Sequence, residues 1–214
     1  MLEPYFKDET TTIYCGDSRK LIPWLFTPAQ PDVDIVLTDP PFGIGFAAQP
    51  TKWQRRAGKE PETWDNATID DVVLKLPELG KKVVIWGGNY YPLPCSRGWL
   101  CWNKPDSPPS MGDFELAWTN QDQIARLITH SIAATNRERL GHATQKPLAV
   151  FRWSLKMITA ELHTGGTLFD PFMGVGTALR AAKEFGLKAI GIDISEENCA
   201  KAAKRMSQEV MSFD

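Results

Sequence analysis

The stretch Phe-Asp-Pro-Phe-Met-Gly-Val-Gly-Thr, residues 169–177, decides the fold of this chain of 214 residues. It joins an apolar segment, 167–170, which predicts a buried strand, to an amphipathic segment that predicts a helix from about Thr177. Glycines at such a turn let a ligand approach the backbone, and the helix start offers free N–H groups and a positive dipole end. A dinucleotide fingerprint would have a third glycine where this chain has Leu179, which argues against NAD and FAD. A tight strand–helix turn without a ligand is the alternative interpretation.

Strand and helix patterns alternate along the rest of the chain, which predicts an α/β fold with a mostly parallel, twisted sheet. Apolar runs predict further strands at 11–15, 34–38, 82–86, 99–103, 114–119 and 188–193. We expect the pair 99–103 and 114–119 to form an antiparallel hairpin at the sheet edge. Periodic apolar positions predict helices from Asp17 or Ser18, from an Asp70 cap through Leu79, from Leu148 to Leu162, and from Ser195.

Composition excludes several classes of protein. Lys plus Arg is 24 and Asp plus Glu is 26, so a net charge of -2 excludes a histone-like protein but not a nucleic-acid enzyme with a local basic face. No apolar run reaches the roughly 20 residues that span a bilayer, and no signal-peptide pattern opens the chain. We therefore expect one cytoplasmic domain, residues 1–214. Cys15, Cys95, Cys101 and Cys199 lack metal-ligand spacing and predict free thiols, with no metal site.

A second motif, Asp39-Pro40-Pro41-Phe42, directly follows the predicted strand 34–38. Two prolines make a stiff turn that fixes the Asp39 carboxylate and the Pro40 carbonyl as acceptors. Phe42 adds a flat apolar surface beside them. Two acceptors and an aromatic ring suit recognition of a planar ring that carries an NH₂ group. The alternative is a rigid turn with a core phenylalanine.

A further candidate is Asp193, at the end of the predicted strand 188–193. An acidic residue at this position can bind the two hydroxyls of a ribose. The alternative is that Asp193 caps the helix that follows.

Together these motifs resemble the amino-directed (N4/N6) DNA methyltransferases, whose signatures are an FxGxG-type cofactor loop and a (D/N/S)PP(Y/F/W) catalytic loop. A third match is His-Ala-Thr-Gln-Lys-Pro at 142–147, close to the family's HPTQKP, with Ala143 in place of proline. A fourth is Cys-Gly-Asp-Ser at 15–18, which looks like the family's GD turn. The order, with the catalytic loop first and the glycine loop last, is similar to the circularly permuted β group. The small size and short recognition region look similar to orphan enzymes of bacteria and phages.

The resemblance implies a Rossmann-like methyltransferase fold, S-adenosylmethionine as methyl donor and double-stranded DNA as substrate. It places Lys146 near the methionine carboxylate of the donor, Asp193 on the ribose and Asp17 near the adenine. The residues it places around the methionine part, with Asp170 near the amino group, are Phe169, Asp170, Pro171, Phe172, Gly174, Gly176 and Thr177. The residues it places on the target base are Asp39, Pro40, Pro41 and Phe42.

For the activity, the resemblance implies methylation of adenine N6 by direct in-line transfer after the base leaves the duplex stack. Cytosine N4 is the alternative, because the family's use of DPP for adenine and SPP for cytosine is only a preference. An inactive fold that only binds nucleic acid, and methylation of RNA or of a glutamine amide in a protein, are further alternatives that Asp39 counts against. Cys95 follows a proline as in cytosine-C5 enzymes, but it lies away from the strand-end position.

Two polar stretches predict DNA contacts. Residues 43–66 form a long stretch that we interpret as a mobile DNA-contacting loop, with an ordinary solvated loop as the alternative. Residues 119–142 are where the resemblance places a small target-recognition region. Members of this group often form homodimers, and the sequence identifies no interface. The basic residues predicted to bind DNA are Lys52, Arg55, Arg56, Lys59, Arg137 and Arg139.

Overall fold

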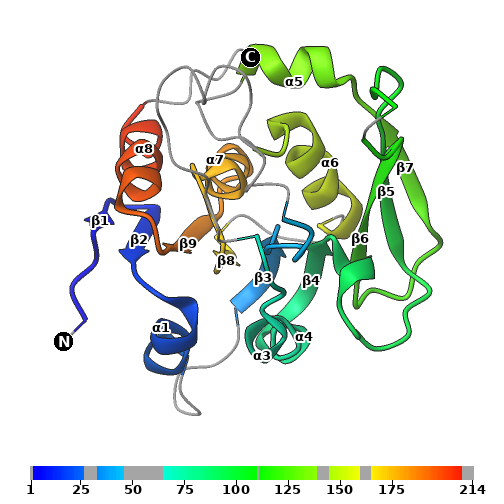
Figure 1. Ribbon diagram of the computed structural model, residues 1–214. Helices are drawn as coiled ribbons and strands as arrows, with labels where there is room; N and C mark the ends of the chain where they lie inside the picture. The colour runs from blue at the N-terminus through cyan, green and yellow to red at the C-terminus, as the bar shows by residue number, and fades with distance from the viewer. Residues whose placement is uncertain are drawn as a thin grey trace.

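A mixed sheet of nine strands is the framework of the molecule (Figure 1). The computed structural model describes residues 2–26, 33–45, 65–109, 111–138, 145–159 and 165–208. The strand order is β1-β2-β9-β8-β3-β4-β6-β5-β7. The bounds are β1 Phe6–Lys7, β2 Thr11–Cys15, β3 Val33–Thr38, β4 Gly80–Trp86, β5 Trp99–Asn103, β6 Phe114–Thr119, β7 Arg126–Thr129, β8 Thr167–Asp170 and β9 Lys188–Asp193.

The five strands β2, β9, β8, β3 and β4 run parallel to one another, as the sequence predicts. Their carboxyl ends therefore meet at one edge of the sheet, where ligands bind in folds of this kind. The predicted hairpin is also present, because β5 and β6 pair in antiparallel register from Trp99↔Trp118 to Asn103↔Phe114. It lies one strand in from the edge, since β7 adds to β5 in parallel. The strand β7 was not predicted from the sequence. It has only four residues, and Leu127 among them is 61% exposed, so it lacks a clear pattern of buried apolar positions.

Helices cover both faces of the sheet (Figure 1). The helices α6, α7 and α8 pack on one face, where they meet Ile35 and Leu37 of β3. The helices α1, α3 and α4 pack on the other face, toward which Val36 points. This alternation along β3, with both sides buried, is expected of a parallel strand inside three layers. The bounds are α1 Ser18–Leu25, α3 Asp70–Val73, α4 Leu76–Leu79, η1 Gly88–Tyr90, α5 Ile132–Glu138, α6 Leu148–Ile158, α7 Thr177–Glu184 and α8 Glu196–Met206.

Two predicted helices differ from the structure. The helix predicted from Asp70 to Leu79 is two single turns, because Pro77 has no N–H and cannot continue a helix through that point. Asp70 lies in the first turn of α3, and Ile69 occupies the cap position. The helix predicted from 148 to 162 ends at Ile158, and residues 160–164 lie outside the described ranges.

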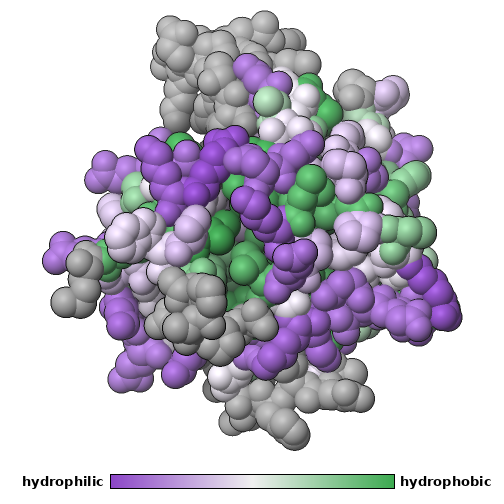
Figure 2. All heavy atoms as spheres, turned by 90° about the horizontal axis from the view of Figure 1, so that it is seen from below, coloured by the Kyte–Doolittle hydropathy of each residue, from purple (hydrophilic) through white to green (hydrophobic). Residues whose placement is uncertain are grey.

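Most of the surface seen from below is hydrophilic, but hydrophobic side chains reach it over the β5–β7 end of the sheet (Figure 2). Phe114, Ile124 and Leu127 are each more than half exposed there. Within the ranges that the structure describes, no helix is both long and apolar enough to cross a bilayer.

Candidate active site

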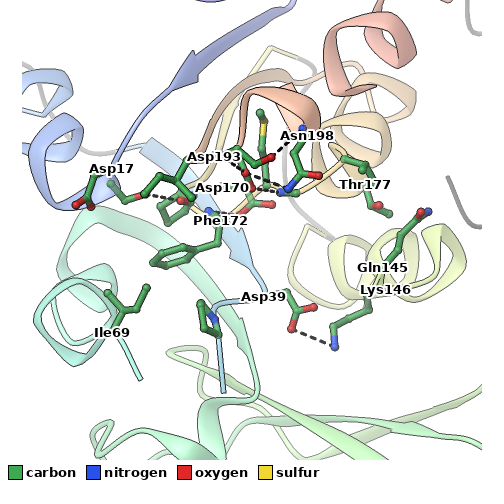
Figure 3. Close-up of a pocket in the computed structure, with 18 of the residues that line it drawn as sticks. Asp17, Asp39, Ile69, Gln145, Lys146, Asp170, Phe172, Thr177, Asp193 and Asn198 are labelled. Carbon is green, nitrogen blue, oxygen red and sulfur yellow. Dashed lines mark hydrogen bonds and ion pairs between the residues drawn. The ribbon is translucent and has the colours of Figure 1, made fainter. Parts of the chain in front are cut away.

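A cavity of about 380 Å³ opens at the carboxyl ends of β2, β3, β8 and β9 (Figure 3). Its size is typical of a small-molecule site. All four sequence motifs contribute to it, although they lie far apart along the chain. The predicted site residues that line it are Asp17, Asp39, Pro41, Lys146, Asp170, Pro171, Phe172, Gly174, Thr177 and Asp193. Those that line it without having been predicted include Asn66, Ala67, Thr68, Ile69, Gln145 and Asn198.

The glycine loop between β8 and α7 needs its glycines for their backbone angles. Gly174 has φ 53° and Gly176 has φ 76°, in the left-handed region where a side chain is strained. Gly176 is the cap residue of α7 and has no side chain to accept a hydrogen bond from the first turn. The start of α7 therefore keeps N–H groups and a positive dipole end available beside the cavity.

Asp193 joins the glycine loop to the start of α8. Its Oδ2 accepts from Gly174 N at 2.9 Å, and its Oδ1 accepts from Ser195 N at 2.8 Å and Asn198 Nδ2 at 3.1 Å. Ser195 is the cap residue of α8, so the carboxylate also supports the helix that follows. Asn198 lies in the first turn of α8, and no sequence motif indicates that its amide reaches Asp193. A ribose contact by Asp193 stays a prediction.

Asp170 is the most buried carboxyl group of the cavity, with only 2% of the residue exposed. Its Oδ1 accepts from Thr38 Oγ1 at 2.6 Å and from Phe172 N at 3.0 Å. The pKa of this carboxyl is raised to about 7, mainly by burial and also by the nearby Asp39 and Asp193, in spite of those two donors. A ligand that brings a positive charge to Asp170 would favour its ionised form.

Asp17 caps α1 and accepts from Arg19 N at 2.9 Å, as the sequence predicts for this turn. The neighbouring Ser18 Oγ donates to Pro171 O at 2.5 Å. This buried contact ties the end of β2 to the glycine loop, and it brings Asp17 to the cavity wall. Contact of Asp17 with an adenine ring stays a prediction.

The Asp39–Phe42 turn is held from two sides, by Asp65 and by Tyr91. Asp65 Oδ1 accepts from Phe42 N at 2.8 Å and from Gly43 N at 3.0 Å. Tyr91 Oη donates to Pro41 O. Asp65 is 23 positions from Phe42 and Tyr91 is 50 from Pro41, so no local pattern links them to the turn.

Phe42 does not line the cavity among the described residues; it packs beside it. Its ring stacks on Tyr90 with centroids 4.9 Å apart and 16° between the planes. Gly87, at φ 68°, lies against the same ring, and a Cβ atom there would come within 1.9 Å of Phe42 Cε1. The aromatic pair stands next to Asp39, but stacking of Phe42 on a target base stays a prediction.

Lys146 lies against Asp39 at the cavity (Figure 3). Its Nζ is 3.1 Å from Asp39 Oδ1 and 2.5 Å from Glu115 Oε2 on β6. Lys104 Nζ is 3.0 Å from the other oxygen of Glu115. Lys146 Nζ also lies 5.0 Å from the centre of the Trp86 ring. A contact between Lys146 and the carboxylate of a bound cofactor stays a prediction, because the ammonium is already paired with two carboxylates.

The charges of this network perturb one another. Burial raises the pKa of Asp39 to about 6; Lys146 opposes that rise and Glu115 adds to it. Burial also disfavours the charged form of Glu115, but Lys146 and Lys104 outweigh it and lower its pKa to about 2. Burial alone would lower the pKa of Lys146, yet its two carboxylate partners raise it. At neutral pH, Glu115 and Lys146 are charged and Asp39 is largely ionised.

The residues predicted to touch DNA are mostly not described by the structure. Lys52, Arg55, Arg56, Lys59 and Arg139 lie outside the described ranges. Arg137 belongs to α5, and Arg126 begins β7 with its side chain exposed. Cys95 is an exposed free thiol and does not line the cavity. Among the described residues, no group of three or more His, Cys, Asp or Glu side chains is placed to hold a metal ion.

Comparison with known proteins gives one family match and several relatives. The family model N6_N4_Mtase, described as DNA methylase, matches residues 85–204. The type II methyltransferase M.HpaI of Haemophilus parainfluenzae is 38% identical over 79 residues, which are 37% of this chain and 24% of that protein. The type II methyltransferase M.ScaI of Streptomyces caespitosus is 21% identical over 267 aligned positions, covering 99% of this chain and 86% of that protein.

Solved structures share the fold. The M1.HpyAVI–SAM complex has a TM-score of 0.60 at 21% identity and covers 91% of this chain and 99% of that one. The cytosine-N4-specific PvuII DNA methyltransferase has a TM-score of 0.59 at 16% identity and covers 98% of this chain and 91% of that one. The predicted Rossmann-like methyltransferase fold is therefore confirmed.

Proposed function

The chain belongs to the N6_N4_Mtase family of DNA methylases, and on this premise we propose that it transfers a methyl group from S-adenosylmethionine to N6 of adenine in double-stranded DNA. The observation that carries the proposal is the position of Asp39. Its carboxylate lines the same cavity as Asp170, Asp193 and the glycine loop. The acceptor for an amine and the candidate cofactor residues thus line one cavity.

The residues of the cavity fit S-adenosylmethionine. The buried Asp170 carboxyl has no cationic partner among the groups that set its pKa, so it suits the amino group of the methionine part. Asp193, the open start of α7 and the backbone of the glycine loop suit the ribose and the remaining polar groups. When bound, S-adenosylmethionine supplies a methyl group that its sulfonium charge already activates.

The protein's own work is to prepare the amine. An exocyclic amino nitrogen is a poor nucleophile, because its lone pair is delocalised into the ring. Hydrogen bonds from its two N–H groups to Asp39 and to the Pro40 carbonyl draw the nitrogen toward a tetrahedral geometry and free that lone pair. The Asp39 carboxylate also stabilises the positive charge that develops on nitrogen, in a site largely closed to water. Alignment of the two reactants then supplies much of the remaining acceleration.

The proton needs no removal before transfer. Once the nitrogen carries the methyl group it is a strong acid, and a carboxylate whose pKa lies near 6 can accept its proton. No residue has to form a covalent bond to the base. The exposed Cys95 outside the cavity is in keeping with this direct route.

Cytosine N4 is the second candidate target. Its amino group presents the same pair of N–H donors, and the PvuII enzyme that shares the fold is cytosine-N4-specific. Adenine is preferred because the motif here is Asp39-Pro40-Pro41-Phe42 and not the serine form that resembles the cytosine enzymes.

Single-molecule sequencing of DNA from cells that express the protein would test the proposal, because it reads the modified base and its context together. We expect adenine modification in a short, recurring context. A cytosine-N4 signal would replace the adenine assignment, and unmodified DNA from cells with soluble, intact protein would overturn the activity. We propose that the protein acts in the cytoplasm of a bacterial cell or a phage-infected host, where its DNA substrate lies.

The basic stretch 52–59 is proposed to contact the phosphate backbone, and residues 119–142 to contact the target sequence. Replacing Arg55 and Arg56 by alanine should reduce the slope of log Kd against log salt by about 2, since each phosphate contact contributes about 0.9. Lys188→Ala is the matched control, because this exposed cation starts β9 at the end opposite the cavity. An unchanged slope in the double variant would remove the loop from the DNA interface.

A homodimer stays a prediction of the resemblance, which light scattering of the purified protein would measure.

A further inference from the structure

Four charged side chains of alternating sign form a chain that ends at the reacting position. It runs from Lys104 to Glu115, from Glu115 to Lys146 and from Lys146 to Asp39, with contacts of 3.0, 2.5 and 3.1 Å. The two lysine side chains are only 5% and 3% exposed. Burying charges costs free energy of desolvation that pairing does not always offset, so the arrangement calls for a functional reason.

The two contacts of Lys146 differ in kind. Its ammonium donates a hydrogen bond to Glu115 Oε2. Toward Asp39 it forms an ion pair at 3.1 Å, and Asp39 Oδ1 is buried without an aligned hydrogen bond from the described residues. Asp39 Oδ1 thus lies beside a cation without accepting an aligned hydrogen bond from it.

That cation creates a problem for methyl transfer. The amine nitrogen becomes positively charged as the new N–C bond forms, so a negative charge beside it helps and a positive charge opposes. Lys146 on its own would cancel the field of Asp39 and repel the nitrogen. The second carboxylate, on Glu115, offsets the charge of Lys146 and accepts a hydrogen bond from its ammonium.

We propose that Glu115 is a positioning residue for methyl transfer: it draws the Lys146 ammonium away from a full hydrogen bond with Asp39, and so leaves Asp39 a net negative acceptor for the amine. The inference rests on the proposed function. It assigns a role to a residue on β6, in the predicted edge hairpin, that belongs to none of the four motifs.

The charged neighbours of Asp39 define what the loss of Glu115 should do. The described titratable groups that act on Asp39 are Lys146 beside it, Glu115 on β6 and Asp65, which accepts hydrogen bonds from the Asp39–Phe42 turn. Asp170 at the end of β8 and Tyr91 after η1 also feel its charge. In Glu115→Gln a negative neighbour disappears and Lys146 turns fully to Asp39. Both changes make Asp39 easier to ionise.

The test therefore combines two measurements on Glu115→Gln. We expect kcat for DNA methylation to fall by on the order of 10-fold or more, with KM for DNA and Kd for S-adenosylmethionine changed less than about 3-fold. We also expect the acidic limb of the pH–rate profile to move to lower pH in Glu115→Gln, although this variant is slower than the wild type. A residue that only supported the fold would lower the rate without moving that limb.

The structure offers a matched control and a rescue. Glu184 is also held by two cations, Arg152 and Arg180, but it lies on α7 outside the cavity. Glu184→Gln should leave the limb and kcat in place. Glu115→Asp keeps the charge and should restore both toward the wild-type values, which separates the charge of Glu115 from its packing.

A measurement without methyl transfer separates this inference from the proposed function. Titration of the Asp39 carboxyl by carbon NMR, with its signal identified in Asp39→Asn, should show a lower pKa in Glu115→Gln than in the wild type. An unchanged pKa, or an unchanged kcat in a folded Glu115→Gln protein, would overturn the positioning role. A lower Asp39 pKa in Glu115→Gln, together with a wild-type protein that methylates no DNA, would instead refute the proposed function and keep the charge coupling.

Discussion

Asp39→Ala is expected to lose DNA methylation by at least about 100-fold, the scale for removing one group that stabilises charge in the transition state. The variant lacks both the acceptor that activates the amine and the negative charge that faces the developing ammonium. It should still bind S-adenosylmethionine within a few-fold of the wild type, because Asp170, Asp193 and the glycine loop are unchanged. Calorimetry and a labelled-methyl transfer assay measure the two effects separately.

Two controls make the result on Asp39 specific. Glu78→Ala removes an exposed carboxylate of α4 that does not line the cavity, and it should leave the rate unchanged. Asp39→Asn keeps the shape of the side chain but not its charge, and it should be nearly as slow as the alanine variant. Methylation at the wild-type rate by Asp39→Ala would end the proposed role of this residue.

Asp170→Asn is expected to lose most of the affinity for S-adenosylmethionine. An ionised Asp170 can pair with a cationic amino group, whereas an amide cannot. Because burial raises the pKa of the empty site to about 7, affinity in the wild type should rise with pH through about 7 and the variant should lack this dependence. Calorimetry across pH 6 to 8.5 would measure it, and equal affinity in the two proteins would contradict the assignment.

The same carboxyl makes the stability of the protein depend on pH. The pKa of Asp170 in the fold, about 7, lies above its ordinary value of 3.8, so between those values the folded state holds a proton that the unfolded state has lost. This contribution to stability is present below about pH 4 and is lost as pH rises toward 7. Asp170→Asn should flatten that decline in thermal unfolding. Asp34→Asn should not, because Lys81 lowers the pKa of Asp34 and its effect lies at lower pH.

Local features of the sequence predicted the fold well. The strand before the glycine loop, the loop and α7 were predictable because apolar runs, glycines and helix periodicity are read within about 20 residues. The caps at Asp17 and Ser195 followed from the same local chemistry. By contrast, β7 is stabilised mainly by pairing with β5, and its four residues carry too little pattern to show it.

Site residues were predictable where they belong to sequence motifs. They were not predictable where the pairing of strands brings them to the site. Asp39, Asp170 and Asp193 end predicted strands, so their convergence follows from the parallel sheet. Glu115 looked like one polar position in an edge strand, and only the register of β6 against β4 and β5 brings it to Lys146. Asp65 reaches Phe42 across a long stretch of chain.

The base that receives the methyl group can be identified directly with an isotope label. The purified protein is incubated with S-adenosylmethionine carrying a deuterated methyl group and with unmethylated duplex DNA, and the DNA is digested to nucleosides for mass spectrometry. We expect labelled N6-methyladenine from the wild type and essentially none from Asp39→Ala. Label on carbon 5 of cytosine, or no label in DNA from a protein shown to bind S-adenosylmethionine, would contradict it.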